Sequence, residues 1–172
     1  MQGLASRGRT TDFSDNNFEA VLETGYGKRT CFLALSLLYD PSNWGATQHH
    51  IDHVMPRSLA DRKALVARSL PEHLIQRIAD SVNRLGNLQL LLGRENLEKS
   101  DMPFAQWIQT RDGEFLDRHL IPNDPALWDV TALPEFVEAR EELIRQRLQR
   151  LDSNSSPDNE SFVLARGHAV GN

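Results

Sequence analysis

Apolar residues recur at helical spacing along most of this chain, and only two short segments have the composition of strands. The helical pattern covers 14–24, 28–39, 60–67, 71–82, 94–100, 104–110, 113–120 and 134–151. Ile51 and Val54, both β-branched, lie just before Pro56 and predict a strand over His50–Val54. A second strand is predicted over Asn87–Leu92. We therefore expect an α+β fold that is mostly α.

The periodic apolar pattern is absent at both ends of the chain, and this predicts the domain boundaries. We expect a flexible lead over 1–13, one folded domain over 14–151 and a polar tail over 152–172. A chain of 172 residues with 40% hydrophobic and 25% charged residues suits a single folded domain. The segment 28–39 is almost entirely apolar and is expected to be buried on most sides, with Cys31 as a small core residue.

Composition also narrows the setting in which the protein works. No apolar run approaches the roughly 20 residues of a membrane helix, and no signal peptide opens the sequence. Cys31 is the single cysteine, which excludes an internal disulfide framework and a site built from several thiolates. A cytoplasmic location is expected.

The charge balance argues at first against a nucleic-acid partner, because 24 acidic residues outnumber 19 Lys and Arg. The distribution is uneven, however. The segment from Arg57 to Lys99 contains eight basic and five acidic residues. The segment from Asp112 to Glu160 contains five arginines and twelve acidic residues. This split allows a basic face on an acidic protein, although an acidic helix in solvent would give the same numbers.

The residues that could act in catalysis or metal binding concentrate first in the segment His49-His50-Ile51-Asp52-His53. A zinc pair from His50 and His53 is disfavoured, because on a strand the i,i+3 spacing sends the two side chains to opposite faces. Asp52 beside His53, joined by an amide from a later helix, would supply hard oxygen ligands for Mg²⁺ or Mn²⁺ and a base that titrates near neutrality. That combination suits phosphodiester hydrolysis.

A second segment strengthens this interpretation. It runs Arg84-Leu85-Gly86-Asn87-Leu88 and continues to Asn96-Leu97-Glu98-Lys99-Ser100 and Met102-Pro103-Phe104. Together with Asp52-His53-Val54-Met55-Pro56, it resembles the HNH, or ββα-metal, nuclease superfamily. The pattern is most similar to the C-terminal nuclease domain of GmrSD-type, modification-dependent restriction enzymes.

The resemblance implies a role for each motif residue. His53 would be the general base, Asp52 and Asn96 would be metal ligands for Mg²⁺ or Mn²⁺, and Asn87 would orient the base or hold the loop. It implies a two-stranded hairpin and a short helix embedded in a helical bundle, with DNA as substrate and a role in defence against foreign or modified DNA. Three basic residues are expected to contact DNA phosphates: Arg57, Arg94 and Lys99.

Two departures from the family pattern shape further expectations. His53 and Asn87 are 34 positions apart, so a helical insertion must project without separating the strands. The family's restriction enzymes place a nucleotide-hydrolysing sensor domain before the nuclease, whereas Gly25-Tyr26-Gly27-Lys28 lacks the spacing of a phosphate-binding loop. A sensor domain or subunit is therefore an expected partner, and we expect the chain to be the nuclease half of a larger protein or a stand-alone relative.

Each residue also has a simpler explanation. Asp52 could be an acid paired with Arg57 or Arg84, Asn87 a turn residue and Asn96 a helix cap. Arg57, Arg94 and Lys99 could be solvated charges. The alternative function is a nucleic-acid-binding or protein-docking module on a degenerate HNH scaffold, and a structural zinc module is a third possibility that the lack of cysteines disfavours.

Overall fold

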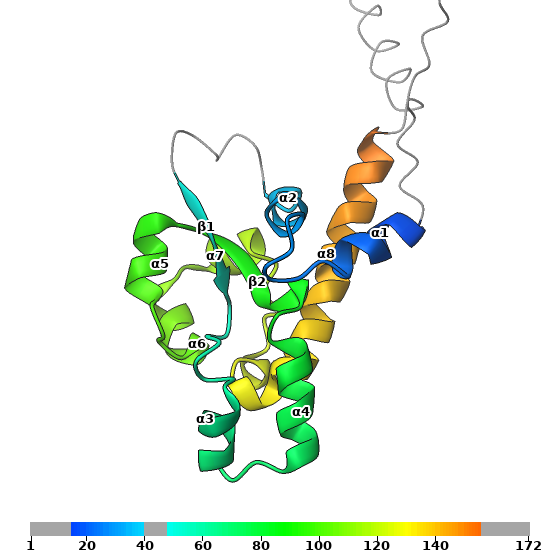
Figure 1. Cartoon of the computed structure of the whole chain (residues 1–172). Helices are drawn as coiled ribbons and strands as arrows, with labels where there is room; N and C mark the ends of the chain where they lie inside the picture. Colours follow the sequence, from blue (N-terminus) through cyan, green and yellow to red (C-terminus); the bar gives the residue numbers. More distant parts are fainter. Residues whose placement is uncertain (1–14, 40–47, 156–172) are drawn as a thin grey trace, which may run out of the picture.

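A two-stranded antiparallel sheet lies at the centre of the fold, formed by β1 (His49–His53) and β2 (Leu88–Leu92). The structure is a computed structural model and describes residues 15–39 and 48–155 (Figure 1). In the register of the pair, His49 lies opposite Leu92, Asp52 opposite Gln89 and His53 opposite Leu88. Both strands lie within one residue of their predicted bounds.

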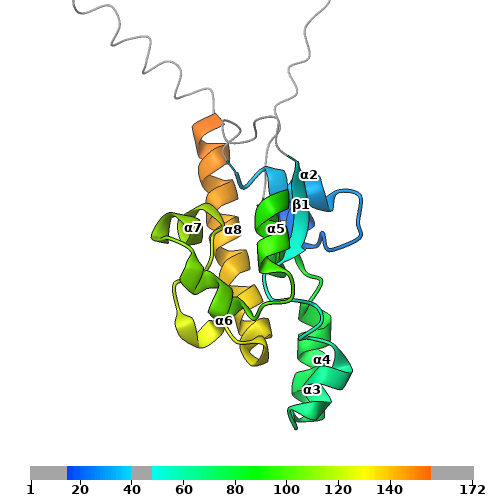
Figure 2. The same cartoon turned by 90° about the vertical axis from the view of Figure 1, so that its left-hand side faces the viewer.

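Helices surround this ribbon, which confirms the α+β, mostly α architecture (Figures 1 and 2). They are α1 (Asp15–Leu22), α2 (Cys31–Ser36), α3 (Arg62–Ala67), α4 (Glu72–Ser81), α5 (Gly93–Lys99), α6 (Phe104–Trp107), α7 (Gly113–Arg118) and α8 (Leu133–Ser155). Short 3₁₀ turns add η2 (Leu85–Asn87), η3 (Ile108–Thr110), η4 (Pro125–Leu127) and η5 (Val130–Ala132).

The long connection between the strands is a helical hairpin of α3 and α4, which extends away from the sheet (Figure 1). The Asp61 side chain caps α3 by accepting a hydrogen bond from the Lys63 N–H. An exposed ion pair between Arg62 and Glu72 joins the two helices. The insertion therefore projects, as predicted, and leaves the strands paired.

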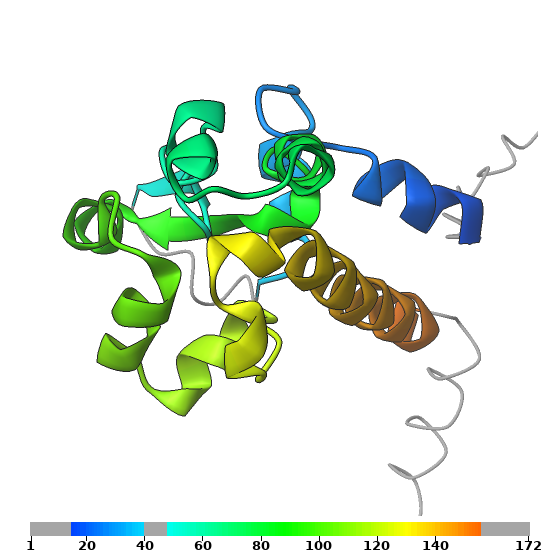
Figure 3. The same ribbon diagram turned by 90° about the horizontal axis from the view of Figure 1, so that it is seen from below.

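The two faces of the ribbon belong to two hydrophobic clusters. Ile51, Leu88 and Leu90 pack into one cluster with α1, α2 and the later turns of α8. Leu91 belongs to the other, which includes α4, α6, α7 and the start of α8. Figure 3 shows α8 running past the sheet with α1 beside it. A single long helix thus contributes to both clusters and supports the sheet.

Three sequence predictions need correction. The segment after Lys28 is helical only over α2, and it is not buried on most sides, since Leu33 is 64% exposed. Cys31 is fully buried as expected, and burial raises the pKa of its thiol. The last helix continues to Ser155, so the predicted tail boundary at 152 falls inside α8.

The predicted lead over 1–13 and the rest of the tail lie outside the described residues. Within the described ranges, no helix combines the length and apolar character needed to cross a membrane.

Candidate active site

His53 ends β1 and is held by residues from two other parts of the chain. Its Nε2 lies 3.0 Å from the Asn83 side-chain oxygen, and its ring centroid lies 4.6 Å from that of Tyr26. An oxygen facing Nε2 selects the tautomer in which Nε2–H donates, which leaves the Nδ1 lone pair to accept a proton. Burial lowers the pKa of His53, the principal effect on it, while the Asn83 hydrogen bond opposes that shift. The imidazole is therefore neutral at neutral pH, as a general base must be.

Asp52 precedes His53 and binds a different set of residues. Its Oδ2 accepts from the Lys99 ammonium at 2.9 Å and from the Gln89 amide at 2.9 Å. Lys99 is 1% exposed and also donates to the His53 carbonyl at 2.7 Å. The simpler explanation paired Asp52 with Arg57 or Arg84, whereas the structure pairs it with Lys99, which ties α5 to β1.

Alternation along β1 points Asp52 and His53 toward opposite faces of the ribbon. The Asp52 face is covered by α5, which lies beside β1 in Figure 2. The His53 side chain contacts Tyr26 and Asn83. The same alternation separates His50 from His53, because the His50 ring lies close to Gly93 at the start of α5. A group that contacts both Asp52 and His53 has to approach along the edge of β1.

Asn96 lies inside α5, one turn before Lys99. Because i and i+3 share a helix face, Asn96 lies on the side of α5 that packs against the strands. Its alternative role as a helix cap is wrong, since α5 begins at Gly93 and Asn96 is its fourth residue. Asp52 and Asn96 are thereby brought to the same side of the ribbon.

Oxygen donors are available here for a hard cation. Both described bonds to Asp52 use Oδ2, and the buried Gln89 Oε1 has no hydrogen-bond partner among the described residues. Asp52 and Asn96 could hold Mg²⁺ or Mn²⁺, with the Gln89 oxygen nearby. In the described part of the chain, no group of three or more His, Cys, Asp or Glu side chains is placed to hold a metal. The Asp52 carboxylate is already paired with Lys99 and would hold such an ion weakly. Substrate phosphates would therefore have to complete the coordination shell of the ion.

Asn87 holds the loop that follows His53. Its Oδ1 accepts from the Met55 N–H at 2.9 Å, and its Nδ2 donates to the carbonyls of Met55 and Val82. Asn87 is fully buried. Of the two roles expected for Asn87, these hydrogen bonds support the holding of the loop.

The turn before β2 is anchored to α8 by Arg140, which sequence reasoning missed. This fully buried guanidinium donates to the carbonyls of Gly86, Leu88 and His119. Burial lowers the pKa of Arg140 to about 10, so it stays charged at neutral pH. Arg140 thus fixes the backbone on both sides of Asn87.

The three basic residues expected at DNA phosphates differ in placement. Lys99 is buried and paired with Asp52, so the expected phosphate contact of Lys99 is wrong. The Arg94 side chain is 86% exposed and lies 3.6 Å from Glu98, a surface pair that costs little to break. Arg57 is exposed, and its charge contributes to the lowered pKa of His53.

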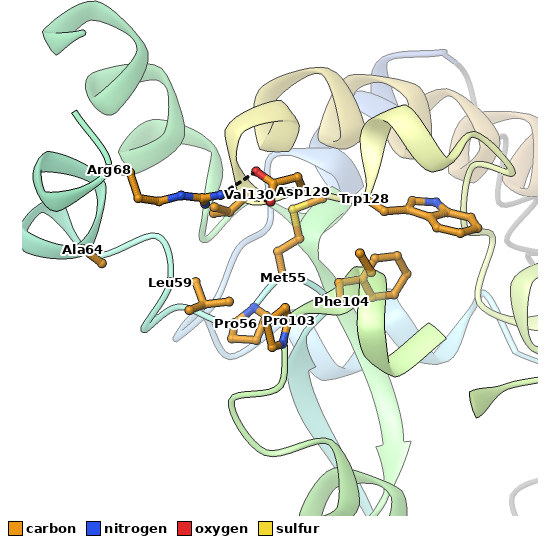
Figure 4. A pocket seen from close by; sticks show the side chains of 11 residues that line it. Met55, Pro56, Leu59, Ala64, Arg68, Pro103, Phe104, Trp128, Asp129 and Val130 are labelled. Atoms are coloured by element: carbon orange, nitrogen blue, oxygen red, sulfur yellow. Dashed lines mark hydrogen bonds and ion pairs between the residues drawn. The ribbon is translucent and has the colours of Figure 1, made fainter. Parts of the chain in front are cut away.

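An apolar cavity of about 220 Å³ lies beyond the loop that Asn87 holds (Figure 4). Met55, Pro56, Phe104 and Trp128 line it, and the ion pair of Arg68 with Asp129 closes one side. The polar groups around His53 and Asp52 are not part of this cavity. The candidate site is therefore the end of β1 and not the cavity.

Comparison with protein families agrees with this arrangement. The sequence model described as GmrSD restriction endonucleases, C-terminal domain, matches residues 9–147. The chain belongs to this family. The GmrSD C-terminal domain match spans all the motif residues, the α3–α4 insertion and most of α8. A comparison with curated proteins found no match. Family membership supports a nuclease of the restriction-endonuclease type.

Sequence reasoning missed Asn83, Gln89 and Tyr26 around the two motif residues. Gln89 could have been found, because an antiparallel hairpin of the predicted strands places it opposite Asp52. Asn83 and Tyr26 lie outside both strands, and no periodic pattern connects them with His53.

Proposed function

We propose that this GmrSD C-terminal domain is a metal-dependent endonuclease that hydrolyses DNA phosphodiester bonds in defence against foreign or modified DNA. One observation carries the proposal: a buried, neutral imidazole, oriented by Asn83, ends the strand that also carries Asp52. A general base needs that protonation state and that fixed orientation.

The roles of the residues follow from their contacts. His53 would take a proton from water at Nδ1, while Asn83 keeps the ring in one orientation. Asp52 and Asn96 would hold the ion, and Lys99 and Gln89 would position the Asp52 carboxylate. When bound, Mg²⁺ or Mn²⁺ would supply charge stabilisation at the scissile phosphate and its leaving oxygen.

The edge of β1 is the surface that supports binding of a phosphodiester. The described sheet contains only β1 and β2, so the outer edge of β1 has no neighbouring strand. A phosphate along this edge would reach His53 on one side and Asp52 on the other. Arg57 and Arg94 would contact flanking phosphates, whereas Lys99 would act through Asp52 and the His53 carbonyl.

Plasmid cleavage in the presence of Mg²⁺ or Mn²⁺ tests the proposal. His53→Ala should reduce the cleavage rate by about 10²- to 10⁴-fold, the usual contribution of a general base. His73→Ala, a matched change at an exposed histidine of α4, should leave the rate unchanged. Cleavage by His53→Ala within tenfold of wild type would contradict the role of His53.

The same assay separates the alternative function. A wild-type protein that binds DNA but cleaves it with neither metal would be a binding module on a degenerate scaffold.

A sensor domain or subunit as partner is tested by adding the region that precedes this domain in a longer protein and measuring nucleotide-dependent stimulation of cleavage.

A further inference from the structure

Tyr26 lies beside the proposed base although no motif includes it. It belongs to the turn between α1 and α2, and its ring packs on His53 with the two planes tilted by 46°. The residue is nevertheless 47% exposed. One side of the Tyr26 ring contacts the buried imidazole, and the rest of the side chain is in solvent. Tyr26 is therefore placed to contact a ligand that binds at His53.

Asn83 holds this turn in place. Its carbonyl accepts from the Tyr26 N–H at 2.9 Å, and Gly25 forms a β-bridge with Arg84. A Cβ at Gly25 would lie 2.6 Å from the Asn83 carbonyl oxygen, so only glycine allows this close approach. Asn83 thus fixes His53 through its side chain and Tyr26 through its backbone.

A groove of about 510 Å³ extends from Tyr26 and Asn83 between α1, α4 and α8. We call it the Tyr26 groove. Its volume is in the range of ordinary ligand sites. Because Tyr26 and Asn83 both line the groove and contact His53, the groove adjoins the proposed base.

The charges of the Tyr26 groove indicate what it would accept. Its arginines, Arg84 and Arg145, are paired with Glu141 and Glu19. Glu23, Asp80 and Lys28 also line the groove, which therefore carries four carboxylates and three cationic side chains. This small negative excess disfavours a phosphate. Carboxylates do accept hydrogen bonds from the exocyclic amine of a base such as cytosine.

We propose that the Tyr26 groove binds an unstacked nucleobase of the DNA, next to the scissile phosphate, with Tyr26 as its stacking platform. The proposal rests on the proposed function, because it places that base beside His53. Extruding a base from a duplex costs free energy, and the cost is lower for a base that is already unpaired. DNA with an unpaired base should therefore be bound and cleaved preferentially, with cleavage next to that base.

A duplex with one bulged cytosine tests the proposal, compared with the same duplex carrying an abasic bulge. Binding is measured in EDTA and cleavage with Mn²⁺. Tyr26→Ala should weaken binding to the cytosine bulge by about 5- to 100-fold, the usual effect of removing one aromatic platform. Tyr26→Phe keeps the ring and should bind as wild type. On the abasic bulge, wild type and Tyr26→Ala should bind equally.

The outcomes distinguish this proposal from the nuclease assignment. If wild type cleaves DNA but Tyr26→Ala binds and cleaves the cytosine bulge as wild type does, the nucleobase site is overturned and the nuclease assignment stands. If wild type cleaves no DNA, the nuclease assignment fails, and the binding measured in EDTA decides the nucleobase site alone. Val66→Ala, at a half-exposed apolar residue of α3 outside the groove, is the matched control and should change neither measurement.

Discussion

At the scale of single residues, the hydrogen bond with Asn83 opposes the effect of burial on the pKa of His53. The Asn83 hydrogen bond raises the pKa of His53, while burial lowers it more. Asn83→Asp should raise that pKa further, because a carboxylate favours the imidazolium. The acid limb of the rate profile should then move to higher pH, whereas Asn83→Ala should move it to lower pH. Rate profiles in pH, with NMR titration of His53, check both shifts, and identical profiles in all three proteins would refute the contact.

We expect Lys99 to stabilise the Asp52 carboxylate and not to contact DNA. Lys99→Met leaves a nearly buried carboxylate without its cation, so the free energy of unfolding should fall by about 3–5 kcal/mol. Adding Asp52→Asn should recover part of that loss, since no unpaired charge remains. Arg94→Met, an exposed change on the same helix, should stay within about 0.5 kcal/mol of wild type. Chemical denaturation measures each value, and equal losses for Lys99→Met and Arg94→Met would contradict the buried pair.

The salt dependence of DNA binding separates Arg57 from Lys99. Each phosphate contact releases counterions, so Arg57→Gln should reduce the slope of log K against log salt by about 1. The double variant Asp52→Asn, Lys99→Met should keep the wild-type slope. Titration of a labelled duplex at several salt concentrations in EDTA gives the slopes. An unchanged slope for Arg57→Gln would remove Arg57 from the interface.

At the scale of elements, the packing of the η2 turn against α8 depends on Gly86. A Cβ there would lie 2.7 Å from the Val137 carbonyl oxygen and 2.9 Å from a Val137 side-chain carbon. Gly86→Ala should therefore destabilise the protein by about 1–3 kcal/mol, because the helix backbone has little room to move. Gly113→Ala is the matched control, since nothing lies within 4 Å of its added Cβ at the start of α7. It should stabilise the protein by about 0.4–1 kcal/mol. Thermal melts compare the two.

The elements also show how far sequence reasoning reaches. Periodicity and turn residues located both strands and the projecting α3–α4 insertion, because these signals are local in the chain. They failed for α2, where an apolar run indicated burial although Leu33 and Phe32 are partly exposed. The contact of His53 with Asn83 joins residues 30 positions apart through a turn, and no local signal encodes such a contact. The motif therefore singled out His53, the proposed base, but not the groups that hold it.

At the scale of the whole molecule, the expected basic face is largely neutralised. Six of the eight basic residues between Arg57 and Lys99 form ion pairs: Arg62, Arg68, Arg77, Arg84, Arg94 and Lys99. Three of these pairs connect residues more than 50 positions apart, from Arg68, Arg77 and Arg84 to Asp129, Glu135 and Glu141. Acidic residues of the C-terminal half of the chain thus neutralise part of the charge of the basic segment, largely at the surface. Of these eight residues, Arg57 and Lys63 form no ion pair among the described residues, so the proposed DNA binding would rely on Arg57 foremost.

Two buried histidines should make the stability of the whole molecule depend on pH. Burial lowers the pKa of His53, and burial with the nearby Arg140 and Arg118 charges lowers that of His119 well below its ordinary value. Neutral His119 can accept a hydrogen bond at Nδ1 from the Tyr39 hydroxyl, 3.0 Å away. The unfolded chain binds protons at both histidines below about pH 6.5, and the folded protein does not. The stability that they contribute is therefore complete above that pH and is lost as the pH falls through it.

His119→Phe tests this linkage at the site with the larger shift. The free energy of unfolding of wild type should fall between pH 6.5 and 5, and each histidine should add up to about 1.4 kcal/mol per pH unit to the slope. His119→Phe keeps a ring against Phe115, which stacks on His119 with centroids 4.0 Å apart, and removes one of the two protons. Its slope should be smaller by up to about 1.4 kcal/mol per pH unit. His73→Gln, at an exposed position, should keep the wild-type slope. Urea denaturation at several pH values gives the three slopes, and a His119→Phe slope equal to that of wild type would show that His119 takes up its proton without unfolding.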